Sequence, residues 1–182
     1  CPPDDLLDGC RNYGPTWEWV DDHADLLRLR ARRAAGVLVD PTADEARKRR
    51  ALELVEAIRG VDATPWLLTL ARQKASDLAL RIDAVKVLAV IRPEAGAWSL
   101  ATQATTEPEA TLAAATLDAV AAIGDARVWP LVATLLGDRR EVPALPQLEP
   151  RSPTSRKLRH QGRVLGAETL GVRAARTLAA LN

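Results

Sequence analysis

Apolar residues recur along most of the chain with the spacing of helices, and turn residues separate the runs. The first run extends from Trp17 to Ala34 and stops at Gly36, and the second follows Thr42 and ends at Ile58. Further runs cover residues 64–74, 77–91, 94–104, 108–123, 124–138 and about 165–181. A period near 3.6 residues predicts amphipathic helices. The pattern therefore predicts an all-α protein.

Local signals place the ends of several of these helices. Two capping boxes are expected, one formed by Thr42 with Glu45 and the other by Thr106 with Glu109, because a hydroxyl and a carboxylate at this spacing satisfy free N–H groups. Gly36, Gly60 and Gly124 are expected to stop the helices that precede them.

One pattern is repeated within these runs. Trp66, Trp98 and Trp129 begin successive apolar runs at nearly equal spacing. Each of the first two is followed by a second run, and these end at Ile91 and Ile123, with the same spacing as Trp66 and Trp98. Stacked helix pairs produce such a period, because each pair must repeat its core face to pack on the next.

The equivalent positions of the three tryptophans indicate that they fill the core and do not form a ligand cage. On this interpretation, Trp98→Ala should lower the free energy of unfolding by about 3 to 5 kcal/mol, as expected for truncation of a buried aromatic residue. Trp17 and Trp19 would point about 200° apart on a helix. One of these two is therefore expected at the surface.

The segment from Gly124 to Asp138 is similar to the turn and first helix of HEAT-like repeats, with a Gly-Asp turn, a Pro-Leu pair and a Leu-Leu end. Val172-Arg-Ala-Ala175 resembles the opening of their second helix. The resemblance implies a right-handed α-solenoid of about four HEAT-like helix pairs over residues 16–182. Their second helices would end at Ile58, Ile91, Ile123 and Leu181. HEAT-like arrays serve mostly as binding scaffolds. Residues 1–15 are expected to form an irregular arm, because proline and glycine residues break any period there.

In such solenoids the second helices usually line the concave face. When the four are aligned at their ends, the outward positions hold Arg50, Glu53, Asp83, Lys86, Ala115, Asp118, Arg173 and Arg176. The charges are mixed at one end, nearly neutral in the middle and basic at the other. Such a face suits a protein segment with a patchy charge pattern, and a merely solvated face is the alternative.

The resemblance fails between Asp138 and Gly166, where a short turn is expected and an insertion (about residues 138–165) is found. A loop this long in a compact domain is usually functional or disordered, so it is either a partner-binding arm or a flexible insertion. Its basic residues are assigned to partner binding: Arg139, Arg140, Arg151, Arg156, Lys157 and Arg159.

Charge is uneven although the net charge is only +1. Acidic residues dominate residues 1–25 and basic residues dominate 139–176, so the molecule is dipolar and not polycationic. The basic half of the insertion has no interleaved aromatic residues that would stack on bases. Nucleic acid is therefore an unlikely partner, and no apolar run is long enough for a membrane-spanning helix.

The first residue, Cys1, resembles the mature end of a bacterial lipoprotein, in which the cysteine sulfur carries a diacylglycerol. The following Pro-Pro-Asp-Asp fits a flexible tether. A fragment boundary at Cys1 is the alternative, and a disulfide between Cys1 and Cys10 is a third possibility if Cys1 is not lipidated. The two thiols lack further ligands at metal-binding spacing, so no metal site is expected.

No catalytic constellation is present in the sequence. His23 and His160 are the only histidines, and the motifs of serine hydrolases, P-loop enzymes and zinc proteases are missing. We therefore expect no cofactor and a non-enzymatic protein-interaction scaffold, an accessory subunit on the periplasmic side of a bacterial envelope, with the cytoplasm as the alternative. Two other functions stay open: a HEAT-like lyase or enzyme accessory using Asp83 and Asp118 in its groove, and a nucleic-acid-binding repeat protein.

Overall fold

The computed structural model describes residues 24–143 and 168–182, and these are mostly helical. The elements are α2 (Ala24–Val39), α3 (Glu45–Ile58), η1 (Val61–Ala63), α4 (Thr64–Arg72), α5 (Leu78–Ile91), α6 (Glu94–Thr106), α7 (Ala110–Ile123), η2 (Ala126–Val128), α8 (Trp129–Ala133), β1 (Glu141–Val142), β2 (Glu168–Thr169) and α9 (Leu170–Ala180). The N-terminal arm, both cysteines, both histidines, Trp17, Trp19 and most of the insertion lie outside the described residues.

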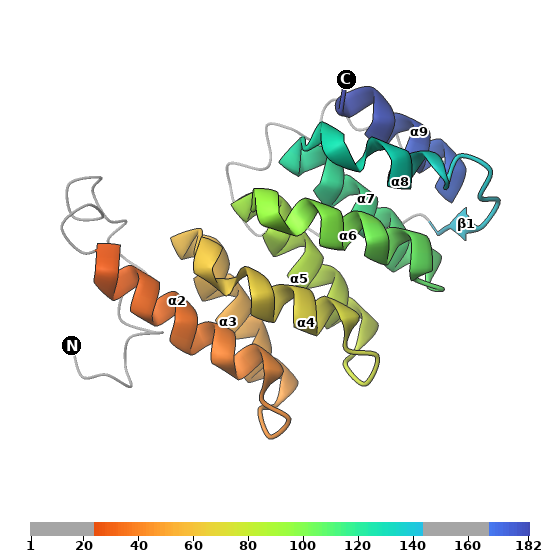
Figure 1. Ribbon diagram of the computed structural model, residues 1–182. Helices are drawn as coiled ribbons and strands as arrows, with labels where there is room; N and C mark the ends of the chain where they lie inside the picture. Colours follow the sequence, from red (N-terminus) through yellow and green to blue (C-terminus); the bar gives the residue numbers. More distant parts are fainter. Residues whose placement is uncertain (1–23, 144–167) are drawn as a thin grey trace, which may run out of the picture.

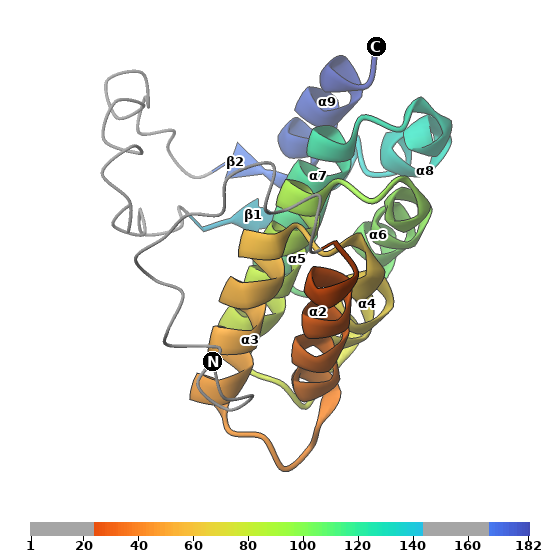
Figure 2. The same ribbon diagram turned by 90° about the vertical axis from the view of Figure 1, so that its left-hand side faces the viewer.

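The helices form two layers (Figures 1 and 2). Helices α2, α4, α6 and α8 lie side by side in one layer, called here the first-helix layer. Helices α3, α5, α7 and α9 form the second-helix layer behind it. Each helix of the first layer packs on the helix that follows it in the chain, and neighbours within a layer also touch, as α5 does with α7. The core lies between the layers and is built largely from leucine, valine and alanine.

Three helices of the second layer end where the sequence predicts, at Ile58, Ile91 and Ile123. Each is followed by a residue with left-handed backbone: Arg59 (φ 51°), Arg92 (φ 54°) and Gly124 (φ 79°). This conformation lets the next N–H groups reach the free carbonyls of the last turn. Glycine adopts it without strain, whereas arginine does so at a cost.

The predicted capping boxes and one predicted stop are wrong. Asp44 caps α3, because its carboxylate accepts a hydrogen bond from the Arg47 N–H at 2.7 Å, while Thr42 bonds to Asp40 instead. Thr106 is still helical and ends α6. Helix α2 continues through Gly36 to Val39, since a single glycine weakens a helix by only about 1 kcal/mol.

The tryptophans do not share one packing position. The buried residues of α4 recur in α6 at a constant offset: Thr64, Leu67, Leu70 and Ala71 correspond to Ala97, Leu100, Gln103 and Ala104. At this offset the counterpart of Trp66 is Ser99, so Trp98 is turned by about 100° from the position of Trp66. Trp66 packs against the core, whereas Trp98 is 56% exposed. The prediction that Trp98 is a core residue is wrong.

Trp129 matches Trp98 and not Trp66. The buried residues Val128, Val132 and Leu135 follow Ala97, Ala101 and Ala104 at a constant offset, and the same offset separates Trp129 from Trp98. Trp129 is accordingly 43% exposed. Trp98 and Trp129 therefore occupy equivalent surface positions on adjacent helices of the first layer.

A two-stranded ribbon joins the two ends of the insertion. β1 and β2 are antiparallel, with Glu141 opposite Thr169 and Val142 opposite Glu168. The Leu170 N–H also donates to the Arg140 carbonyl at 2.9 Å. These bonds hold the start of α9 beside the segment that follows α8.

Gly171 fixes how closely α9 approaches this segment. Its N–H donates to the Asp138 carbonyl at 2.9 Å, and a Cβ at this position would lie 2.5 Å from the Leu136 carbonyl oxygen. Because the obstructing atom is backbone, Gly171→Ala should force α9 outward and lower the free energy of unfolding by about 1 to 3 kcal/mol. Urea denaturation measures this change.

Gly36→Ala is the matched control for that substitution. Gly36 lies inside α2, and a Cβ there meets no atom within 4 Å. Alanine should therefore raise the free energy of unfolding by about 0.5 to 1 kcal/mol. Equal effects of the two substitutions would contradict the close approach at Gly171.

Candidate protein-interaction surfaces

The charged residues predicted on the second helices do lie on that layer and are at least partly exposed: Arg50, Glu53, Asp83, Lys86, Asp118, Arg173 and Arg176. We call this set the second-helix face. Ala115, expected among them, is only 9% exposed and belongs to the core. The structure thus brings these charged residues to one layer, but it also gives most of them partners within the molecule.

At the α3–α5 end of the face, Arg49 gathers the acidic side chains. Its guanidinium lies 2.7 Å from Glu45, 3.5 Å from Asp83 and 3.7 Å from Asp77. Lys86 pairs with the same Asp83 at 3.3 Å. Arg49 was not predicted from the sequence, because it does not lie at one of the outward positions of α3 but on the side of that helix that meets α5.

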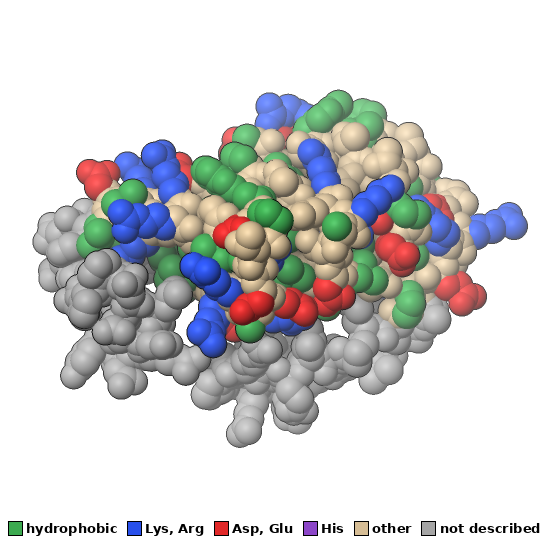
Figure 3. Space-filling view, turned by 90° about the horizontal axis from the view of Figure 1, so that it is seen from below, with side chains coloured by type: hydrophobic (Ala, Val, Ile, Leu, Met, Phe, Trp, Pro, Cys, Tyr) green, Lys and Arg blue, Asp and Glu red, His purple; other side chains and the backbone are tan. Residues whose placement is uncertain are grey.

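At the α7–α9 end, Glu168 has the corresponding role. Arg173 binds Asp118 at 3.0 Å and Glu168 at 2.6 Å, and Arg176 binds Glu168 at 2.5 Å. The basic end predicted from Arg173 and Arg176 is therefore largely neutralised. On the face seen in Figure 3, acidic and basic side chains are likewise interspersed over the part of the chain that is described.

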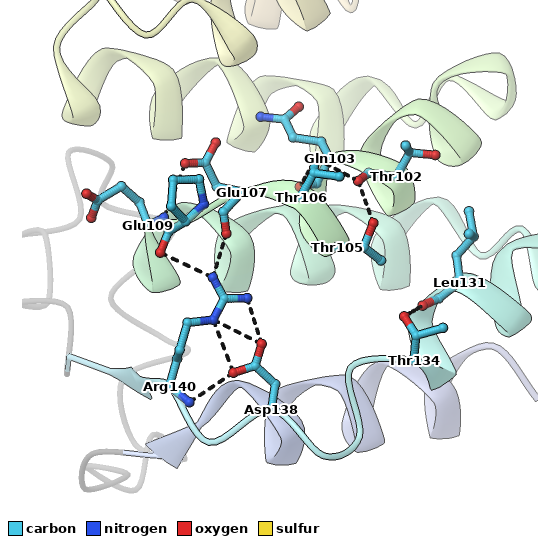
Figure 4. A network of polar contacts seen from close by, with 11 residues as sticks. Thr102, Gln103, Thr105, Thr106, Glu107, Glu109, Leu131, Thr134, Asp138 and Arg140 are labelled. Atoms are coloured by element: carbon cyan, nitrogen blue, oxygen red, sulfur yellow. Dashed lines mark hydrogen bonds and ion pairs between the residues drawn. The ribbon is translucent and has the colours of Figure 1, made fainter.

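The two described arginines of the insertion differ. Arg139 is exposed, whereas the Arg140 side chain connects two segments of the chain (Figure 4). Its guanidinium binds Asp138 at 2.6 Å and donates to the carbonyl oxygens of Glu107 at 2.5 Å and Pro108 at 3.2 Å. The hydrogen bonds from the Arg140 side chain lower the pKa of Asp138 below its usual value. Arg140 thus ties the segment after α8 to the turn between α6 and α7.

A buried ion pair lies beneath the same turn. Arg81 and Glu107 have side-chain exposures of 7% and 5%, and their charged groups are 2.6 Å apart. Arg81 also donates from Nε to the Ala71 carbonyl at 2.9 Å, and Glu107 accepts from the Glu109 N–H at 3.2 Å. Each of these contacts is internal, so the role of the pair is structural. The only signal in the sequence was a charged residue within the apolar run of α5.

The exposed tryptophans form a second candidate surface, on the first-helix layer. Trp98 and Trp129 lie at equivalent positions of α6 and α8, and we call them the tryptophan pair. Most large apolar side chains of the described chain are buried, so two exposed indoles on adjacent helices depart from the general pattern. Tryptophan is enriched at the energetic centres of protein interfaces.

Neither metal chemistry nor a membrane span is indicated by the described residues. They contain no group of three or more His, Cys, Asp or Glu residues arranged to hold a metal ion. No helix among them combines the length and apolarity needed to cross a bilayer.

A comparison of the chain with protein-family models, curated proteins and solved structures found no match.

Proposed function

We propose that the chain is a non-enzymatic protein–protein interaction scaffold, built as a right-handed α-solenoid of four HEAT-like helix pairs. The architecture is supported by the packing of α2 on α3, α4 on α5, α6 on α7 and α8 on α9. The recurrence of buried positions at nearly the same offset from one pair to the next also supports it, because a solenoid stacks similar units on one another.

The observation that carries the binding role is the exposure of the tryptophan pair. Burying such side chains against a partner removes a large apolar area from water, and truncating a tryptophan at the centre of an interface commonly weakens binding by about 2 kcal/mol or more. The second-helix face offers less, because its ion pairs would have to be broken or kept during binding, and exposed ion pairs contribute little. We therefore place the main contact on the first-helix layer, with a protein that presents an apolar surface.

The proposal extends to location, as a lipid-anchored accessory subunit on the periplasmic side of a bacterial envelope. This part rests on the sequence around Cys1 alone, since Cys1 lies outside the described residues. Intact mass spectrometry of the N-terminal peptide from native membranes is the test. The mass of a diacylglycerol on Cys1 is expected, and an unmodified Cys1 would contradict the anchor without affecting the scaffold role.

Site-specific photo-crosslinking tests the binding surface. A photoreactive amino acid replaces Trp98 in one variant and Lys86, on the second-helix face, in another. We expect crosslinking in cells to yield one dominant protein adduct from position 98 and little from position 86. Adducts from position 86 alone would transfer the contact to the second-helix face and contradict the proposal.

A pair of alanine substitutions provides the affinity test once the adduct is identified by mass spectrometry. Trp98→Ala should weaken binding of that protein at least about tenfold, as expected for a tryptophan at the centre of an interface. Leu29→Ala removes another exposed apolar side chain of the same layer, 46% exposed on α2, and should leave the affinity unchanged. Equal losses would indicate a general loss of apolar surface and not a specific contact.

A further inference from the structure

Lys48 is a largely buried cation without a counter-ion at hydrogen-bond distance among the described residues. It lies on α3 and is 8% exposed. Its ammonium has no hydrogen bond or ion pair with any described residue, although its charge contributes, after the hydrogen bonds from Thr42, to the lowered pKa of Asp40. The stem of Lys48 is buried, whereas its ammonium is not fully enclosed and keeps contact with solvent.

At the equivalent position of α5, the structure has a buried cation that does have a counter-ion. The buried residues of α3 recur in α5 at a constant offset: Lys48, Ala51, Leu52 and Val55 correspond to Arg81, Ala84, Val85 and Leu88. Lys48 is thus the counterpart of Arg81. Both are cations on the core side of a second-layer helix, and both face the turn that precedes the next one.

The counter-ion is what differs between the two positions. Glu107, the partner of Arg81, stands two residues before Glu109, the N-cap of α7. Two residues before Asp77, the N-cap of α5, the chain has Ala75. The Glu107 carboxylate also accepts a hydrogen bond from the Glu109 N–H. The equivalent N–H, that of Asp77, has no acceptor among the described residues.

A pocket of about 280 Å³ lies beside Ala75. It is lined by Lys48 and Glu45 of α3, by Pro41 and Ala43 before it, and by Gln73, Ala75, Ser76, Asp77 and Leu80 around the start of α5. This volume is just below the usual range for ligand sites, roughly 300 to 1,000 Å³. Only a small molecule would fit.

We propose that this pocket binds the carboxylate of a small anion, held by the Lys48 ammonium and the Asp77 N–H in the place that the Glu107 carboxylate takes beside Arg81. The acidic residues of the lining do not oppose this. Glu45 and Asp77 both pair with Arg49, which leaves the charge of Lys48 for the ligand. The uncapped first turn of α5 adds N–H groups and the positive end of the helix dipole.

Acetate is the probe for this site. The full-length protein is titrated with sodium acetate against sodium chloride at constant ionic strength, and NMR follows the backbone amides of residues 75–80 and the side-chain Cε of Lys48. We expect saturable shifts at both. Shifts that rise linearly with acetate, or that leave the Lys48 Cε unmoved, would overturn the proposal, and this readout needs no variant.

Two variants with matched controls assign the ligands. Lys48→Met keeps the length of the buried stem and should weaken acetate binding at least about tenfold, because it removes a charge-assisted hydrogen bond. Lys86→Met, at an outward position of α5, should not. Ala75→Glu should supply the missing carboxylate from within the chain, raise the melting temperature and abolish acetate binding, whereas Ala79→Glu on the exposed side of α5 should do neither. Unchanged acetate affinity in Lys48→Met or Ala75→Glu refutes the site.

Discussion

Glu107→Leu is expected to lower the free energy of unfolding by about 3 to 5 kcal/mol, although it removes one carboxylate and keeps a side chain of similar size. The substitution leaves the Arg81 guanidinium buried without its counter-ion, and an uncompensated buried charge is strongly destabilising. The exposure of only 7% for the Arg81 side chain leaves little access for water to compensate. Urea denaturation of the two proteins measures the difference.

The double variant Arg81→Met/Glu107→Leu is the control, because it removes both charges together. Replacing a buried ion pair by apolar residues of similar volume is often neutral. The Ala71 carbonyl would keep its second donor, Gln103 Nε2, at 3.1 Å. We therefore expect the double variant to recover most of the stability lost in Glu107→Leu, and additive losses would contradict the interpretation.

Leu100→Ala is expected to lower the free energy of unfolding by about 2 to 5 kcal/mol, the range for truncation of a buried leucine. Trp98→Ala, two residues earlier on α6, should change it by less than about 1 kcal/mol, although it removes a larger side chain, because little core contact is lost at a mostly exposed position. Leu100 is fully buried, whereas Trp98 is 56% exposed. Thermal and urea denaturation of both variants give the comparison.

The opposite order of the two effects would restore Trp98 to the core and remove the basis for the tryptophan pair. Ser99→Ala serves as a reference on the same turn, since the Ser99 hydroxyl makes no described hydrogen bond, and the bond that its carbonyl accepts from Arg72 at 3.1 Å is kept. It should leave stability nearly unchanged, so it shows whether the α6 backbone tolerates substitution at this point.

The ends of the second-layer helices were predictable because their signals are local. Ile58, Ile91 and Ile123 each precede a residue that takes left-handed backbone, and glycine or proline nearby marks such stops in the sequence. The starts were less predictable. Asp44, Thr42 and Thr106 can all accept N–H groups chemically, and only the path of the turn decides which one does.

The position of Trp98 could not be predicted from spacing, because equivalent buried positions are one residue further apart in the first-helix layer, between α4 and α6, than in the second-helix layer, between α5 and α7. Ala71 of α4 corresponds to Ala104 of α6, whereas Leu80 of α5 corresponds to Leu112 of α7, which is one position closer along the chain. The connection between α6 and α7 is also shorter than the one between α4 and α5. A single period read from the tryptophans cannot represent both offsets.

The charged residues of the second-helix face were predictable one by one, but their pairing was not. Asp118 and Arg173 are 55 positions apart, and their contact depends on how α9 is stacked against α7. Helical periodicity shows which way a side chain points, but it gives no information about the neighbouring helix. For the same reason, the partners Arg49 and Glu168 could be found only in the structure.

The short ribbon of β1 and β2 makes the segment between its strands replaceable. Because Glu141 and Thr169 are paired, the chain leaves and re-enters the helical body at one point, whatever length lies between. The entropic cost of a longer loop rises only by about 0.6 kcal/mol for each doubling of its length. A reporter domain whose own termini are close together could therefore be grafted there, and α8 and α9 would keep the register that Gly171 and the ribbon define.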